Sequence, residues 1–98
     1  MTLPVVLRSE TELDAVEARD WYDRKRAGLG DEFTADLRKL LELVRSGPSL
    51  FARDAEGVRR ARLRRFPYVT YFRVEPNRIE IIAILHGSRD PEFWRQRR

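Results

Sequence analysis

The sequence has 98 residues, of which 42% are hydrophobic and 37% are charged, and its formal net charge is +4. A chain of this length buries about 65% of its unfolded surface, so we expect one domain over residues 1–98. The lack of cysteine excludes a disulfide scaffold, and with His86 as the one histidine it also excludes the usual Cys/His zinc site.

The chain contains no run of about 18 apolar residues, so we expect no membrane-spanning segment. Its first residues, MTLPVVLRSETE, lack the basic start and apolar core of a signal peptide. We therefore expect a cytoplasmic protein that needs neither a metal nor another cofactor.

The charge is divided unevenly between the two halves of the chain. Residues 1–57 carry nine basic and twelve acidic side chains, whereas residues 58–98 carry eleven basic and four acidic side chains. The net charges are thus −3 and +7, and 18 of the 20 basic residues are arginines. This asymmetry indicates a surface for a polyanion or an acidic protein, the alternative being that arginine serves here only to keep the protein soluble.

The chain begins with a short apolar run, Leu3–Leu7, which contains Pro4 and predicts an edge strand. A helix is predicted over residues 10–26, because Ser9 and Glu12 have the spacing of a capping box. Acidic residues are frequent early in this helix and basic residues late, as the helix dipole favours.

Two predicted helices form a hairpin, because only a short glycine-containing turn separates them. The second helix covers residues 31–46 and has the clearer helical spacing of apolar residues. In the first helix the residues expected on the apolar face are Leu13, Val16 and Trp21, with Tyr22 beside them, and in the second they are Phe33, Leu37, Leu40, Leu41 and Val44.

The second half of the chain has the period of two that is typical of strands. Apolar and arginine residues alternate over 60–64, residues 68–74 are rich in aromatic and β-branched types, and residues 79–85 are apolar on both faces. The last of these belongs at the centre of a sheet. The predicted fold is therefore α+β, a helical hairpin packed on a small mostly antiparallel sheet, in the order β-α-α-β-β-β with a short C-terminal helical turn.

The arginines of the first of these strands are candidates for binding phosphate. Arg60, Arg62 and Arg64 are expected to point to one face at intervals of about 6.6–6.8 Å, which is close to the phosphate spacing of an extended nucleic acid. Guanidinium groups bind phosphate oxygens in a bidentate manner. The alternative is a solvated face whose arginines pair with acidic groups. The full set of candidate nucleic-acid or partner-binding residues is Arg64, Arg65, Tyr68, Tyr71, Arg73 and Trp94.

Catalysis by this chain would depend on His86, because imidazole is the side chain that exchanges protons most readily near neutral pH. RNA cleavage without a metal needs a proton acceptor, a proton donor and cations for the charged intermediate. His86, Arg89, Arg60 and Arg62 could supply these parts. The alternative is a structural histidine that closes a loop, which is the more frequent role of a lone histidine.

The chain resembles the RelE/ParE superfamily of toxins from type II toxin–antitoxin, or plasmid stabilisation, modules. The resemblance covers nearly the whole chain and depends on the order and spacing of several short segments. These segments are Asp20-Trp21-Tyr22, Gly28–Phe33, Pro48–Phe51, Val58–Tyr68 and His86–Pro91.

The resemblance implies a growth-inhibiting toxin that a cognate antitoxin neutralises, with a toxin–antitoxin heterotetramer as one form of the complex. RelE-like members cut mRNA on the ribosome with basic strand residues and a later arginine, and Arg60, Arg62 and Arg89 resemble these. Some family nucleases use a histidine near the end of the chain, where His86 stands. We also expect an acidic antitoxin segment to lie over the basic sheet.

Two positions depart from the RelE pattern. Trp94 stands about where RelE has a tyrosine, and Tyr68 falls near its catalytic arginine. ParE-like members lack the nuclease residues and poison DNA gyrase instead. Our expectation is a ribosome-dependent mRNA endoribonuclease; the alternatives are a non-enzymatic gyrase inhibitor and an inactive member that only binds its antitoxin.

Overall fold

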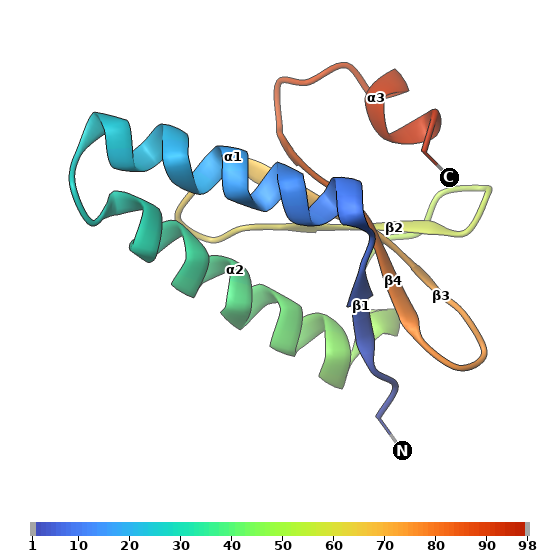
Figure 1. The fold of residues 1–98 in the computed structure, drawn as a ribbon. Helices are drawn as coiled ribbons and strands as arrows, with labels where there is room; N and C mark the ends of the chain where they lie inside the picture. The colour runs from blue at the N-terminus through green and yellow to red at the C-terminus, as the bar shows by residue number, and fades with distance from the viewer. Residues whose placement is uncertain (1, 98) are drawn as a thin grey trace.

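The computed structural model describes residues 2–97 and confirms the predicted α+β class and element order (Figure 1). None of the helices within these residues is both long and apolar enough to cross a membrane. The elements are β1 (Val5–Leu7), α1 (Ser9–Lys25), α2 (Leu29–Ser46), the 3-10 helix η1 (Pro48–Leu50), β2 (Val58–Arg62), β3 (Tyr68–Val74), β4 (Ile79–His86) and α3 (Glu92–Arg95).

The four strands form one sheet in the order β1-β4-β3-β2, in which β1 is parallel to β4 and the other pairs are antiparallel. The prediction of a central strand is confirmed, because β4 lies between β1 and β3. The β3–β4 pairing shifts between Tyr71 and Phe72, which lie opposite Ala83 and Ile81. Ile82 is therefore the extra residue of a β-bulge, which bends the strand and increases its local twist.

Both faces of the sheet bury apolar side chains. The α1–α2 hairpin covers one face, where the larger core includes Phe33, Phe72 and Ile81. A smaller core on the opposite face contains Val58, Val69, Tyr71, Ile82, Ala83, Leu85 and Trp94. Because Trp94 belongs to α3, the short C-terminal helix covers part of the face that the hairpin leaves open.

The predicted core face of α1 is wrong. Leu13, Val16 and Trp21 are 56%, 39% and 45% exposed, and the buried residues of α1 are Thr11, Ala18 and Tyr22. Small side chains let α1 approach the sheet closely, so its contacts with the sheet do not require a large apolar face.

The predicted capping box is also absent. Ser9 is the first helical residue, and no side chain caps the helix, whose N-cap residue is Arg8. The Arg8 carbonyl instead accepts hydrogen bonds from the backbone N–H groups of Thr11 and Glu12.

The second helix agrees better with its apolar pattern. Phe33, Leu37, Leu40 and Val44 are buried as predicted, and Leu41 is half-buried. The helix begins at Leu29 rather than at residue 31, directly after Gly28, whose φ of 88° is in the left-handed region that favours glycine. Gly30 lies against α1, where a Cβ would be 2.5 Å from the carbonyl oxygen of Arg19, so the hairpin packs too closely for any larger residue.

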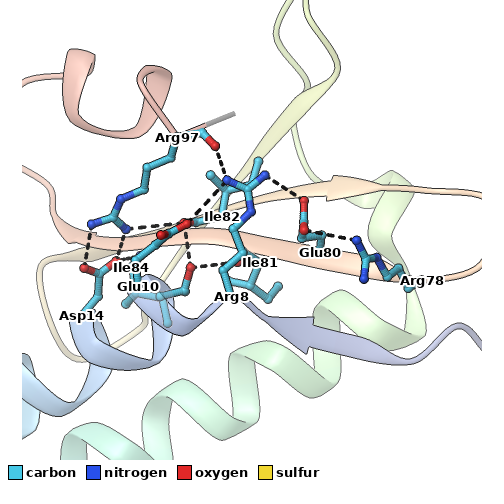
Figure 2. A network of polar contacts seen from close by, with 10 residues as sticks. Arg8, Glu10, Asp14, Arg78, Glu80, Ile81, Ile82, Ile84 and Arg97 are labelled. Carbon is cyan, nitrogen blue, oxygen red and sulfur yellow. Dashed lines mark hydrogen bonds and ion pairs between the residues drawn. The ribbon is translucent and has the colours of Figure 1, made fainter.

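One edge of β4 has hydrogen-bond partners that come from side chains of α1. Strand β1 ends opposite Ile81, and the backbone groups beyond that point have no strand beside them. The Thr11 hydroxyl lies 2.9 Å from the Ile81 carbonyl oxygen and 2.7 Å from that of Ile82, and the Ile84 N–H donates to Asp14 Oδ2 at 3.1 Å. Figure 2 shows Asp14 next to Ile84. The hydrogen bonds of Thr11 and Asp14 fix α1 to the central strand.

Thr11 and Thr70 are both buried, but we expect their replacement by valine to change the free energy of unfolding in opposite directions. Thr70 Oγ1 is buried without a hydrogen-bond partner among residues 2–97, whereas the Thr11 hydroxyl is bonded to β4. We expect Thr70→Val to raise the free energy of unfolding by about 1 kcal/mol and Thr11→Val to lower it by about 1–3 kcal/mol. Urea unfolding of the two variants beside the wild type measures both effects. Equal changes in the two variants would contradict the assignment.

Candidate functional site

Two exposed arginines of β2 lie on the sheet face opposite the helical hairpin. Arg60 is the register partner of Tyr71, and Arg62 is that of Val69, so both share the face of the smaller core. Neither guanidinium group has an ion-pair partner among residues 2–97. The strand therefore presents two unneutralised positive charges at the spacing of alternate residues.

The rest of the predicted arginine row is arranged differently. Strand β2 ends at Arg62, so Arg64 lies in the following turn and is not on the strand face. Arg65 points to the helical side, where its guanidinium is 2.7 Å from Glu32 and its backbone N–H donates to Asp36. The hydrogen bond from Arg65 is the main cause of the lowered pKa of Glu32. Arg65 thus links the turn to α2, although its side chain is 56% exposed.

Tyr68 and His86 are opposite each other at the end of the β3–β4 pair. Their ring centroids are 5.5 Å apart at an interplanar angle of 73°. The Tyr68 ring also contacts Phe33, at 5.1 Å, and Tyr22, at 6.0 Å, so it packs on the helical side of the sheet. Burial is the main cause of the raised pKa of Tyr68, with Arg89 acting in the opposite direction. Its phenol is therefore protonated at neutral pH.

His86 is exposed, and its Nδ1 atom already has partners. The backbone N–H of Ser88 donates to Nδ1 at 3.1 Å, and the Ser88 hydroxyl oxygen is 2.8 Å from the same atom. Because a backbone N–H can only donate, Nδ1 is an acceptor, and the neutral ring carries its proton on Nε2. This contact closes the turn that follows β4.

A hollow of about 360 Å³ lies between α1 and the end of β4. Tyr68, His86 and Arg89 line it from the sheet and the following loop. The guanidinium of Arg89 stacks over the ring of Phe93 at 4.2 Å. The side of the hollow formed by α1 contributes Asp14, Glu17, Ala18, Trp21 and Arg24.

The sequence did not single out Glu17, Trp21 and Arg24 as parts of a site. Their position beside the His86 loop depends on the packing of α1 against β4, and no local pattern in α1 signals it. They give the hollow a mixture of acidic, basic and aromatic groups.

Gly87 joins the hollow to the arginine face. A Cβ on Gly87 would lie 3.9 Å from Arg62 Nη1, and the Gly87 N–H donates to the Pro67 carbonyl at 2.7 Å. The structure therefore brings Arg62, His86 and Arg89 to the same end of the sheet. Arg60 lies two residues before Arg62 in β2, on the same face of the sheet, away from the hairpin.

Tyr71 and Trp94 are not free to stack on nucleic-acid bases in this structure. Their rings stack on each other, with centroids 5.0 Å apart at an angle of 18°, and they are 8% and 3% exposed. Trp94, a candidate binding residue in the sequence, is thus buried within the smaller core. Arg73 is half-buried, and its charge helps to lower the pKa of Glu80.

The C-terminal segment is fixed to both α1 and β1. Arg97 forms a bidentate ion pair with Asp14, at 2.5 and 3.0 Å, and its carbonyl accepts a hydrogen bond from Arg8 (Figure 2). Arg8 also pairs with Glu80 at 2.9 Å, which is the main cause of the lowered pKa of Glu80. The Asp14 side chain is largely buried, although it belongs to the acidic early part of α1.

No group of three or more His, Cys, Asp or Glu side chains within residues 2–97 has an arrangement that could hold a metal ion. Guanidinium, imidazole, phenol and carboxylate groups line the hollow at this end of the sheet.

Trp94 and Phe93 are neighbours in α3, but we expect their replacement by alanine to affect stability very differently. Trp94 is buried against Tyr71, whereas Phe93 is 47% exposed. We expect Trp94→Ala to lower the free energy of unfolding by about 3 kcal/mol and Phe93→Ala to lower it by less than about 1 kcal/mol. Chemical denaturation followed by far-UV circular dichroism measures both. Equal losses would show that α3 does not cover the sheet through Trp94.

Comparison with known proteins agrees with this geometry. A solved structure from the chromosomal ParDE toxin–antitoxin system of P. aeruginosa matches with a TM-score of 0.76 and 19% sequence identity. The match covers 86% of this chain and 95% of that chain, and it shows the same fold. No curated protein matches the chain significantly.

The family model of the ParE toxin of the type II toxin–antitoxin system parDE matches residues 5–91. This range includes the hairpin, the whole sheet and the loop that carries His86 and Arg89. The chain therefore belongs to the ParE toxin family of type II toxin–antitoxin systems.

Proposed function

We propose that this toxin acts by binding DNA gyrase and that it does not cleave RNA. Membership of the ParE family makes the chain the toxin of a module with a cognate antitoxin. The resemblance of the sequence to ParE-like members suggests gyrase as the target. The observation that carries the choice of binding over cleavage is the hydrogen bonding of His86.

A general base needs a free lone pair directed at the proton that it removes. In neutral His86 the Nδ1 lone pair accepts from the Ser88 N–H, and Nε2 carries the proton. The ring therefore has no lone pair to offer unless the contact with Ser88 breaks. This state favours a role of His86 in closing the loop rather than in proton transfer.

The other groups that could transfer protons are separated from the exposed arginines. Tyr68 and Glu17 line the hollow on the helical side of the sheet, whereas Arg60 lies on the opposite face. Tyr68 has a raised pKa and is not a base at neutral pH. A phosphate held by Arg60 would thus lie across the sheet from these groups.

Arg60 and Arg62 fit a binding role well. They project from a strand whose backbone is fixed by its ladder with β3, so little conformational freedom is lost when a partner binds. Their lack of acidic partners within residues 2–97 means that binding does not first break an ion pair. A negatively charged surface of gyrase, or the DNA held by it, would complement them.

RNA cleavage is the second candidate, because Arg62, His86 and Arg89 lie around Gly87. If His86 left Ser88, its Nδ1 lone pair would become available at the end of the sheet where Arg62 and Arg89 also lie. That arrangement would combine a proton acceptor with cations for a charged intermediate.

Purified toxin tests the two functions side by side. We expect it to inhibit DNA supercoiling by gyrase and to leave mRNA on programmed ribosomes intact. His86→Gln is expected to keep inhibition within about threefold of the wild type, because the proposed binding does not use the imidazole for proton transfer. Cleavage of mRNA in the ribosomal A site that disappears in His86→Gln would instead establish the nuclease and overturn the proposal.

Charge reversal tests the arginine face. We expect Arg60→Glu and Arg62→Glu each to raise the toxin concentration needed for half-inhibition of gyrase at least tenfold, equivalent to about 1.4 kcal/mol. Lys39→Glu is the matched control, since it makes the same charge change at an exposed position of α2. An equal loss in all three variants would show that net charge, and not this face, determines inhibition.

A further inference from the structure

The hollow between α1 and the end of β4 contains charged side chains that have no partner. Glu17 and Arg24 line it from α1 and Arg89 lines it from the loop, and none of the three side chains forms an ion pair or hydrogen bond within residues 2–97. Asp14, the fourth charged residue of the lining, is neutralised by its bidentate pair with Arg97. Two guanidinium groups and one carboxylate therefore leave the hollow with a net charge of +1.

The wall formed by α1 combines these charges with an aromatic surface. Glu17, Trp21 and Arg24 are four and three residues apart, which is the spacing of one helix face. Trp21 is 45% exposed, so its indole is accessible from the hollow that it lines. The Lys25 ammonium lies 4.7 Å from the centre of the indole ring and adds positive charge to this wall.

The size and charge of the hollow suit a small anion with a flat ring. Sites for small molecules have volumes of about 300–1,000 Å³, and the hollow has about 360 Å³. Guanidinium groups bind phosphate oxygens in a bidentate manner. Arg89 stacks its planar face on Phe93, which leaves the N–H donors at the edge of the guanidinium available. Because indole rings also pack against nucleobases, this combination is typical of a nucleotide site.

The carboxylate of Glu17 distinguishes between the bases, because an ionised carboxylate can only accept hydrogen bonds. Guanine presents two adjacent donors, the N1–H and the N2 amino group, on its Watson–Crick edge. Each of the other bases has an acceptor beside its donor on that edge, and this acceptor would face the carboxylate. Glu17 therefore favours guanine.

We infer that the hollow is a binding site for a guanine nucleotide. The base packs on Trp21 and donates to Glu17, and the phosphate binds Arg24 and Arg89. The positive charge disfavours the main alternative, which is a basic side chain of a partner protein. The inference goes beyond the proposed action on gyrase and does not depend on it, because the gyrase contact is assigned to Arg60 and Arg62.

The guanine has two sources, a free nucleotide or a nucleic-acid strand. Gly87 joins the hollow to the arginine face, where its Cβ position is 3.9 Å from Arg62 Nη1. A strand with its guanine in the hollow could therefore continue toward Arg62. The chemistry at Glu17 and Trp21 is the same for both sources.

Calorimetric titration of the purified toxin with GMP, AMP and guanosine tests the site. We expect GMP to bind at least about tenfold more tightly than AMP, because only guanine offers two donors to Glu17. Guanosine is expected to bind at least about tenfold more weakly than GMP, because it lacks the phosphate. No binding of GMP at about 1 mM, or equal affinities for GMP and AMP, would overturn the inference.

Variants then test the two walls of the site. Glu17→Gln is expected to weaken GMP binding at least about tenfold and to reduce the preference over AMP below about threefold. Glu12→Gln is the matched control, since it makes the same change at an exposed position of α1 outside the hollow, and we expect it to change the affinity less than about twofold.

Arg24→Gln is expected to weaken the binding of GMP but not that of guanosine, because its guanidinium is assigned to the phosphate. Circular dichroism of each variant shows that the fold remains. Unchanged GMP binding by Glu17→Gln, or equal losses of GMP and guanosine binding in Arg24→Gln, would overturn the assignment.

Two oligodeoxynucleotides, TTGTT and TTATT, distinguish the sources of the guanine. Both sources require TTGTT to bind more tightly than TTATT, and the reverse order would overturn the inference. Binding of TTGTT more tightly than GMP indicates a guanine within a strand, and weaker binding indicates a free nucleotide. These measurements contain no gyrase, so their outcome is separate from that of the supercoiling assay.

Discussion

The structure depends on how the unpaired edge of β4 obtains its hydrogen bonds. Strand β1 is only three residues long, so the carbonyl of Ile82 and the N–H of Ile84 would be buried beside α1 without a strand partner, and the carbonyl of Ile81 would have only the Arg8 N–H at 3.5 Å. Thr11 and Asp14 lie one helical turn apart in α1. The Thr11 hydroxyl is the donor for the two carbonyls, and the Asp14 carboxylate is the acceptor for the Ile84 N–H. This requirement fixes the position and rotation of α1 on the sheet. Through α1 it also determines what lines the hollow beside His86.

The same edge connects the two faces of the sheet. Asp14 accepts from Ile84 and also pairs with Arg97, which holds the segment after α3 against α1. The stack of Trp94 on Tyr71 then closes the second core. An aspartate on one side of the sheet therefore helps to keep the cover on the other side in place. The arginines of β2 remain exposed because this cover is short.

The sequence could predict the features that depend on local interactions, and it could not predict those that depend on distant segments. The apolar spacing in α2 and the alternation in the strands reflect the packing of those segments, so their class, order and central strand were predictable. The exposed apolar residues of α1 misled the prediction because α1 is held by a hydroxyl, a carboxylate and small side chains. Asp14 has the same local signature as its solvated acidic neighbours, and only its partner residues distinguish it.

The candidate site was predictable to a similar extent. Arg60 and Arg62 alternate within a strand, and period-two spacing places them on one face. Arg64 was expected on the same face because the sequence does not show that the strand ends at Arg62. The mutual stacking of Tyr71 and Trp94 also depends on chain segments that meet only in the folded protein.

The central strand has a consequence for how the toxin is made. Thr11 and its partner Ile81 in the central strand are 70 residues apart in the sequence. Asp14, which also binds this strand, is 83 residues from its partner Arg97. Contacts between distant residues have a high loop-closure entropy and slow the folding of small domains. The hairpin, whose contacts are local, can form while the chain is still being synthesised, but the sheet cannot. An interval therefore separates synthesis of the chain from completion of the sheet.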